Sequence, residues 1–334
     1  MRRLLLSVIL IISLVGCGGG APEGSPNTEG GDRVSSDGFF TDATTLYDAG
    51  GNAFVMRGVN HSHTWFKDKL DTALGAIAAT GANTVRIVLS NGERWNKDEA
   101  ADVRRVTEKC AELEMIAVLE VHDATGSNDA EDLMKAVDYW IEIKDVLIGN
   151  EAYVIVNVAN EWYGDRNGED WRDGYIEAIT RLRGAGIKNT IIVDAAGWGQ
   201  YPKSIHDFGR EVFDSDKLRN TVFSIHMYEY AGKNEKTVKV NIDRALDIGV
   251  PVIIGEFGQR HTNGKVAFET ILSYCEEKGV GYLGWSWKGN SGGVEYLDIA
   301  LQWDGSALSE DWGEILVNSE YGLKATGKKC TVFE

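Results

Sequence analysis

The chain has 334 residues, of which 34 are Lys or Arg and 51 are Asp or Glu, so its formal net charge at pH 7 is −17. A surface this acidic repels phosphate backbones and anionic lipid headgroups, which excludes nucleic acid as an expected partner. A neutral ligand is compatible with that charge.

The first residues have the pattern of an export signal. Two arginines precede the apolar run 4-LLLSVILIISLV-15, which is shorter than the roughly 20 residues of a membrane span. The next residues, 14-LVGC-17, resemble a bacterial lipobox; an ordinary secretion signal with an incidental cysteine is the alternative. We therefore expect residues 1–16 to be a lipoprotein signal peptide, and a lipidated Cys17 to anchor the exported protein to a membrane of the bacterial cell envelope.

Residues 17–38 follow as a segment rich in Gly, Ser, Pro and acidic side chains, which predicts a flexible tether. From Phe39 onward the composition becomes globular, and no Pro- or Gly-rich break divides residues 39–334. We expect these residues to form a single, monomeric domain. Its first part, 39–58, predicts a small N-terminal β-hairpin that turns at residues 49–52.

Eight β-branched runs then follow one another at intervals of 29 to 37 residues. Amphipathic helical patterns lie between them, for example at 67–81, 98–114 and 237–249. Eight such units predict an α/β fold with one (β/α)8 TIM barrel. A doubly wound open sheet is the alternative, but it would usually carry a glycine-rich phosphate loop after the first strand, and none is present. The runs are 55–60, 84–90, 116–122, 153–161, 190–197, 222–228, 251–258 and 281–289.

Polar and aromatic residues stand at the C-terminal ends of these runs, where the chemistry of a TIM barrel is located. Core packing alone would not produce this pattern, so the rim is the predicted active site. The rim residues are Asn60, His61, Arg86, His122, Asn160, Glu161, Trp198, His226, Tyr228, Glu256, Trp285 and Trp287.

Glu161 and Glu256 each follow an apolar run, the fourth and the seventh. A lone glutamate there more often forms a salt bridge or caps a helix, but two facing carboxylates among aromatic side chains indicate glycoside hydrolysis. Arg86 is a candidate to keep Glu256 ionised, since a nearby positive charge favours the carboxylate. Asn160 is placed to bind a sugar 2-hydroxyl.

His122 and His226 would each be structural histidines if considered alone, but their shared rim position favours contacts to substrate or to the carboxylates. Metal ligation by these two and His61 is the alternative; no HExxH spacing supports it, so we expect neither a metal nor a cofactor. The three cysteines beyond Cys17 show no CxxC spacing, and one disulfide plus one buried thiol remains open.

Six tryptophans are candidate platforms for sugar rings, because an indole offers a large apolar face with one donor. About half of them are expected to pack in the barrel or its loops, and Trp198 and Trp285 are the preferred platforms because each lies at or just after a strand end. The six are Trp65, Trp95, Trp162, Trp198, Trp285 and Trp287.

Taken together, the motifs resemble glycoside hydrolase family 5, a family of retaining (β/α)8 enzymes with glutamates at strands four and seven. The resemblance covers residues 39–334 and in detail is to bacterial β-mannanases. The motifs that carry it are 57-RGVNHSHTWF-66, 157-NVANEWYG-164, 194-DAAGWGQYP-202, 224-SIHMYEYAG-232, 254-IGEFG-258 and 285-WSWKGN-290.

This resemblance implies that Glu161 is the acid/base and Glu256 the nucleophile. It also implies that Tyr228 positions the nucleophile and that Trp198 shapes the first leaving-group subsite. The remaining residues would line the subsite in which the bond is cleaved. They are Arg86, His122, Asn160, His226 and Trp285.

The activity that the resemblance implies is retaining endo-hydrolysis of β-1,4-mannosidic linkages in mannans, including galactomannan and glucomannan, by double displacement. An endo-β-1,4-glucanase on the same fold is the first alternative, because the residues do not show how the sugar 2-hydroxyl is received. A non-catalytic, carbohydrate-binding surface lipoprotein is the second, and the presence of both Glu161 and Glu256 speaks against it.

Overall fold

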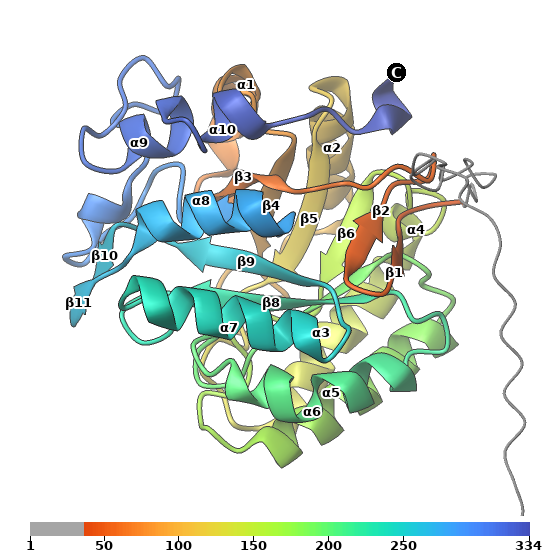
Figure 1. The fold of residues 1–334 in the computed structure, drawn as a ribbon. Helices are drawn as coiled ribbons and strands as arrows, with labels where there is room; N and C mark the ends of the chain where they lie inside the picture. The colour runs from red at the N-terminus through yellow and green to blue at the C-terminus, as the bar shows by residue number, and fades with distance from the viewer. Residues whose placement is uncertain (1–36) are drawn as a thin grey trace, which may run out of the picture. The chain divides into compact units, whose positions relative to one another are not determined.

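The computed structural model describes residues 37–334, and its centre is a closed barrel of eight parallel strands (Figure 1). Their order around the barrel is β12-β3-β4-β5-β6-β7-β8-β9. Every predicted run overlaps one of these strands, which confirms the TIM barrel. The strands are β3 (Arg57–His61), β4 (Thr84–Leu89), β5 (Ile116–Val121), β6 (Val154–Asn157), β7 (Ile191–Asp194), β8 (Thr221–Met227), β9 (Val252–Phe257) and β12 (Gly281–Gly284).

Helices follow the strands and cover the outside of the barrel, so every residue of strands such as β4 and β5 is buried. This double burial is why the strands read as continuous apolar runs. The three predicted helices are confirmed as α1, α2 and α7. The helices are α1 (Leu70–Ala79), α2 (Ala100–Glu112), α3 (Ala130–Glu142), α4 (Lys144–Leu147), α5 (Gly168–Gly184), α6 (Lys203–Ser215), α7 (Glu235–Asp247), α8 (Phe268–Lys278), α9 (Gly313–Asn318) and α10 (Leu323–Thr326).

The N-terminal hairpin and its predicted turn at residues 49–52 are confirmed, since Tyr47 pairs antiparallel with Ala53 across that turn, but the chain also makes an earlier turn that was not predicted. Strand β1 (Phe40–Asp42) pairs antiparallel with β2 (Thr45–Tyr47), so the chain reverses at residues 43–44. Ala43 has a left-handed φ of 49° there. Glycine and asparagine usually occupy such turns, so the turn at Ala43 left no signal in the sequence, whereas the glycine-rich turn at 49–52 did.

The hairpin closes the floor of the barrel, the end at which the strands begin. Phe39, Leu46 and Phe54 form an apolar cluster there with the first residues of the strands, for example Ile116. The C-terminal segment joins the same cluster through Cys330. Both ends of the described chain therefore lie at the floor and leave the opposite rim free for a site.

The cysteines of the described residues form no disulfide. Cys110, Cys275 and Cys330 are all buried free thiols, so the possibility of one disulfide bond is wrong. Within residues 37–334, no helix has both the length and the apolar character needed to cross a membrane. The predictions for residues 1–16 and for Cys17 lie outside the described residues.

Candidate active site

The rim predicted from the sequence encloses one cleft at the C-terminal ends of the strands. Seven of the predicted residues line it: His122, Asn160, Glu161, Trp198, Tyr228, Glu256 and Trp285. Arg86 and His226 lie directly beneath this surface and contact its carboxylates. The structure therefore brings together every residue that was assigned to the site, apart from Cys17.

Glu161 is held in an unusual backbone conformation. Glu161 was predicted to lie directly at the end of its strand. Strand β6 ends at Asn157, so Glu161 lies instead in the loop that follows it. Its φ of 46° is in the left-handed region, which side-chain-bearing residues rarely adopt. The Glu161 backbone N–H donates to Asp194 at 3.0 Å, which helps to fix the loop. Strain of this kind is typical of functional sites.

Glu256 lies within β9, and both of its carboxylate oxygens accept hydrogen bonds. Arg86 on β4 donates to Oε1 at 2.9 Å, and the hydroxyl of Tyr228 donates to Oε2 at 2.9 Å. Arg86 also donates to the side-chain oxygen of Asn160 at 2.7 Å. These contacts provide a positive charge beside Glu256 and fix the direction of its carboxylate.

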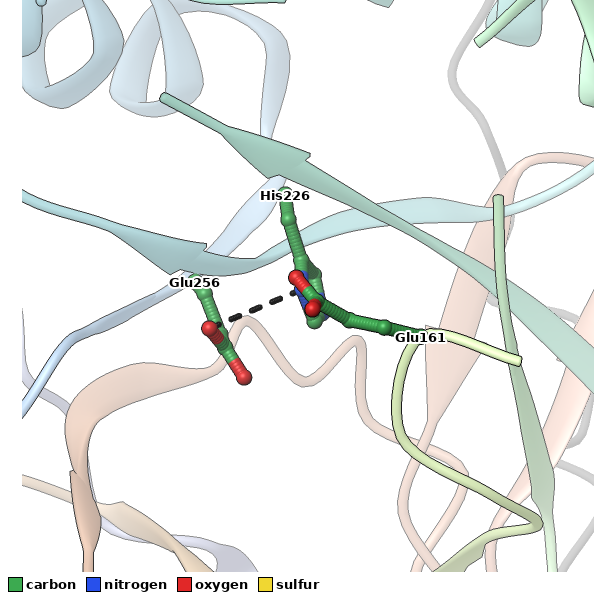
Figure 2. A group of neighbouring side chains, drawn as sticks. All are labelled: Glu161, His226 and Glu256. Carbon is green, nitrogen blue, oxygen red and sulfur yellow. Dashed lines mark hydrogen bonds and ion pairs between the residues drawn. The ribbon is translucent and has the colours of Figure 1, made fainter. Parts of the chain in front are cut away.

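The two glutamates meet at His226, as Figure 2 shows. Nδ1 of His226 lies 2.8 Å from Oε1 of Glu161 and 3.6 Å from Oε2 of Glu256. One carboxylate oxygen from each glutamate and one nitrogen of His226 all lie within 4.8 Å of one another. Carboxyl groups about 5–5.5 Å apart are typical of retaining glycosidases, whereas inverting enzymes need about 6.5–9.5 Å. The spacing favours retention.

The environments of the two glutamates differ, as acid and nucleophile require. Burial raises the pKa of Glu161, and the negative charge of Glu256 raises it further, although His226 opposes both effects. Burial alone would lower the pKa of His226, but the charges of Glu256 and Asp194 outweigh it and raise that pKa to about 10. The site therefore places a protonated His226 beside Glu161, whose pKa lies above its ordinary value.

Comparison with known proteins matches residues 47–291 to the model of "Cellulase (glycosyl hydrolase family 5)". That match covers most of the chain. The chain belongs to glycosyl hydrolase family 5.

Its relatives within family 5 are similar over nearly the whole described length. A mannan endo-1,4-β-mannosidase of Salipaludibacillus agaradhaerens is 57% identical over 89% of this chain and 96% of its own. One of Cellvibrio japonicus is 40% identical over 90% of this chain and 70% of its own. The solved mannohexaose complex of Thermomonospora fusca β-mannanase is 41% identical, with a TM-score of 0.84 over 90% of this chain and all of that one.

A metal ion is the alternative reading of the family 5 cleft, since Glu161, His226 and Glu256 each offer a ligand atom. A metal-bound histidine must be neutral. With a pKa of about 10, His226 keeps its proton at neutral pH and already lies 2.8 Å from Glu161. These side chains already have protein partners, since Glu256 also accepts hydrogen bonds from Arg86 and Tyr228.

Several residues of the site were missed by sequence analysis. Glu120, on β5, is fully buried and lies 3.0 Å from Nδ1 of His122, and this contact raises the pKa of His122 despite its burial. The single acid within the apolar run 116-IAVLEVH-122 was the signal that could have found it. Asp194 accepts the N–H of Glu161 and lies 3.6 Å from Nε2 of His226.

Of the six candidate tryptophans, two line the cleft, two belong to the core, and Trp65 and Trp95 are partly exposed beside His122, with ring centroids 5.3 and 5.7 Å from its ring. Trp198 is 51% exposed at the cleft, and Trp285 lies in the cleft with its ring 5.7 Å from that of His122. Trp162 and Trp287 are buried and belong to the core. The two preferred platforms therefore lie where sugar rings could stack, and the other cleft-lining residues were not predicted. These are Gln200, Glu229, Tyr230, His261, Val294 and Leu297.

Proposed function

We propose that this chain is a retaining endo-β-1,4-mannanase that hydrolyses internal linkages of mannans, including galactomannan and glucomannan. The observation that carries the reaction type is the pair of facing carboxylates, Glu161 and Glu256, with oxygen atoms within 4.8 Å of each other. Mannan as the substrate is supported by the 57% identity with a relative named for that activity.

In the first step, Glu256 attacks the anomeric carbon while Glu161 gives its proton to the glycosidic oxygen. The bond between that oxygen and the anomeric carbon breaks, and the departing part of the chain leaves as an alcohol. Arg86 and Tyr228 bind the oxygens of Glu256 and hold it in line for attack. The product is an ester between Glu256 and the retained sugar.

In the second step, a water molecule attacks the same carbon from the side that the departing sugar has left. Glu161, now a carboxylate, takes the proton of this water, and the ester bond to Glu256 breaks. The two displacements together retain the configuration. Asn160 lines the cleft with its amide oriented by Arg86 and Thr125, and its second N–H is available for the sugar 2-hydroxyl.

Initial rates of reducing-sugar release from linear mannan and from carboxymethylcellulose test this function, with Glu256→Gln as the inactive comparison. We expect release from mannan by the wild type and at least a thousandfold slower release by the variant, because the nucleophile is lost. Release from cellulose alone would keep the mechanism and overturn the substrate. Release from neither polysaccharide would contradict the proposed activity and favour the non-catalytic, carbohydrate-binding alternative.

We also propose that Cys17 carries acyl chains that anchor the exported enzyme to the cell envelope. The support is the sequence of residues 1–17, in which a basic start and an apolar run precede a lipobox-like cysteine. Fractionation of cells that produce the wild type or Cys17→Ser tests it. We expect the variant in the soluble fraction, and equal membrane retention of both would contradict the anchor.

A further inference from the structure

A histidine–carboxylate pair that the mechanism does not use forms part of the cleft wall. Nδ1 of His261 lies 3.0 Å from Oε2 of Glu229, and the amide of Asn263 donates to the other oxygen of Glu229 at 3.1 Å. The Glu229 side chain is 6% exposed and that of His261 is 31% exposed. A buried carboxylate, hydrogen-bonded through both of its oxygens, therefore fixes the orientation of the partly exposed His261 ring at the cleft.

His261 is presented by a small hairpin on the rim. Strand β10 (Arg260–His261) pairs with β11 (Gly264–Lys265), and Figure 1 shows this hairpin at the opposite end of the barrel from β1 and β2. The hairpin is tied to the loop after β8, since the Ala267 N–H donates to the Gly232 carbonyl at 2.8 Å. The hairpin is a separate two-stranded sheet that does not pair with the barrel strands, and its residue His261 lines the cleft.

The position of the His261 ring is close to the reacting groups. It packs on the ring of Tyr228 with centroids 4.7 Å apart, and Tyr228 is the donor to Glu256. Among residues 37–334, the imidazole ring of His261 forms a hydrogen bond through Nδ1 alone. Nε2 is therefore the nitrogen available to a ligand, one aromatic ring away from the nucleophile.

This part of the cleft lies on the side where the departing sugar is expected. Trp198 and Gln200 follow β7, and Tyr230 follows β8, the two barrel strands next to β6 on one side. Glu161 follows β6 and protonates the oxygen that departs, so the leaving group lies toward Glu161. Gln200 accepts the Tyr230 N–H at 3.1 Å, which joins the two loops into one wall with the His261 hairpin.

We propose that His261, oriented by Glu229, binds a hydroxyl group of the sugar unit that departs with the leaving group. This inference rests on the proposed function, because it requires a carbohydrate chain to lie across the cleft. Nδ1–H donates to the Glu229 carboxylate, so Nε2 accepts a hydrogen bond from the sugar hydroxyl and holds the departing sugar where its glycosidic oxygen meets the proton of Glu161. His261 is thus a determinant of which leaving groups the enzyme accepts.

Two substrates, one with a sugar leaving group and one with an aryl leaving group, test the proposal. The kcat/KM values of the wild type and His261→Ala are measured with mannohexaose and with dinitrophenyl β-mannobioside, whose leaving group has no sugar hydroxyls. We expect the variant to lose about tenfold on mannohexaose, the scale of one hydrogen bond, and less than about twofold on the aryl substrate. His261→Gln, which keeps a hydrogen-bonding group, should recover part of the loss.

A matched control is His206→Ala on α6, where Nε2 lies 3.0 Å from the Asn241 carbonyl oxygen; it should change neither rate. If His261→Ala loses equally on both substrates, His261 only packs against Tyr228, and the proposal is wrong. No loss on either substrate also overturns it. Failure of the proposed function is distinguished by the wild type itself, which would then release nothing from mannohexaose.

Discussion

Arg86 joins side chains from three other strands of the barrel through one guanidinium group. Its Nε donates to Asn157 at 2.9 Å, and one terminal nitrogen donates to both Asn60 and Glu256 at 2.9 Å. The other terminal nitrogen donates to Asn160. Arg86 is 1% exposed, so these contacts depend on the planar fork of an arginine, which a lysine cannot reproduce. A residue predicted only as a counter-charge for Glu256 therefore also sets the positions of its neighbours.

The hydroxyl of Tyr228 should matter for the chemical step rather than for folding. Tyr228→Phe removes the donor 2.9 Å from Oε2 of Glu256 but keeps the ring that packs on His261. Hydrogen bonds to charged groups contribute about 1.5–3 kcal/mol, so we expect kcat on mannan to fall by roughly 10- to 150-fold. Steady-state kinetics and thermal unfolding measure the two effects. Tyr153→Phe, at the floor beside Phe333, is the control, and an unchanged kcat in Tyr228→Phe would contradict the assignment.

Glu120 should act through His122. In Glu120→Gln the carboxylate that raises the pKa of His122 is gone, while the charges of Glu256 and Arg86 that also act on this ring remain. His122 then loses its proton at a lower pH. Taking the protonated ring, which can donate to the substrate, as the active form, we expect the ratio of wild-type to variant kcat/KM to rise with pH. Rates on mannan between pH 5 and 9 measure it. Glu112→Gln, on the exposed side of α2, is the control, and a ratio independent of pH would assign Glu120 a purely structural role.

At the scale of elements, the sequence was informative where burial is uniform. The β-branched runs predicted all eight barrel strands, because strands covered by helices show little besides apolar residues. It was less informative where local geometry overrides propensity, as at Ala43 in the hairpin turn and at Glu161, which lies beyond the end of β6. The pairing of Glu229 with His261 was not predictable, since it depends on how two loops meet and leaves no local pattern.

Two buried histidines, His61 at the end of β3 and His63 in the short helix that follows (His63–Trp65), should make the stability of the fold sensitive to acid. Burial, together with the charge of His63, lowers the pKa of His61 to about 3, and both of its ring nitrogens lack hydrogen-bond partners among the described residues. The unfolded chain takes up that proton near pH 6.5, so stability is full above this pH and is lost as the pH falls toward 3.

The variant His61→Leu removes this proton uptake. Between pH 6.5 and pH 5, we expect the wild type to lose about 1.6 kcal/mol of unfolding free energy more than the variant does, because the slope approaches about 1.4 kcal/mol per pH unit only below pH 6. Urea unfolding at the two pH values gives this loss for each protein. Because the packing cost of the leucine is the same at both pH values, it does not affect the comparison. Equal losses in both proteins would show that His61 is not the group that titrates.

At the scale of the whole domain, Asp48 connects the two ends of the described chain. Its carboxylate accepts the N–H of Asn52 at 2.9 Å, and the hydroxyl and N–H of Thr331 at 2.6 and 3.2 Å. We expect Asp48→Ala to lower the unfolding free energy by about 2–3 kcal/mol, because three partly buried donors lose their acceptor, while kcat stays unchanged. Denaturant unfolding checks it. The control Asp71→Ala breaks an exposed pair with Arg105 and should cost at most about 1 kcal/mol; equal effects would contradict the role of Asp48.

The first described residues are bound at the floor, where the Phe39 N–H donates to the Glu151 carbonyl and its own carbonyl accepts from Asn220. The cleft opens at the other end of the strands. Nineteen residues lie between Cys17 and Asp37, and twenty steps along the chain span at most about 70 Å. If Cys17 carries the proposed lipid anchor, this segment joins the domain at the end of the barrel opposite to the cleft. The anchored segment would then not obstruct the cleft, which would stay accessible to polysaccharides too long or too branched to pass between the enzyme and the cell surface.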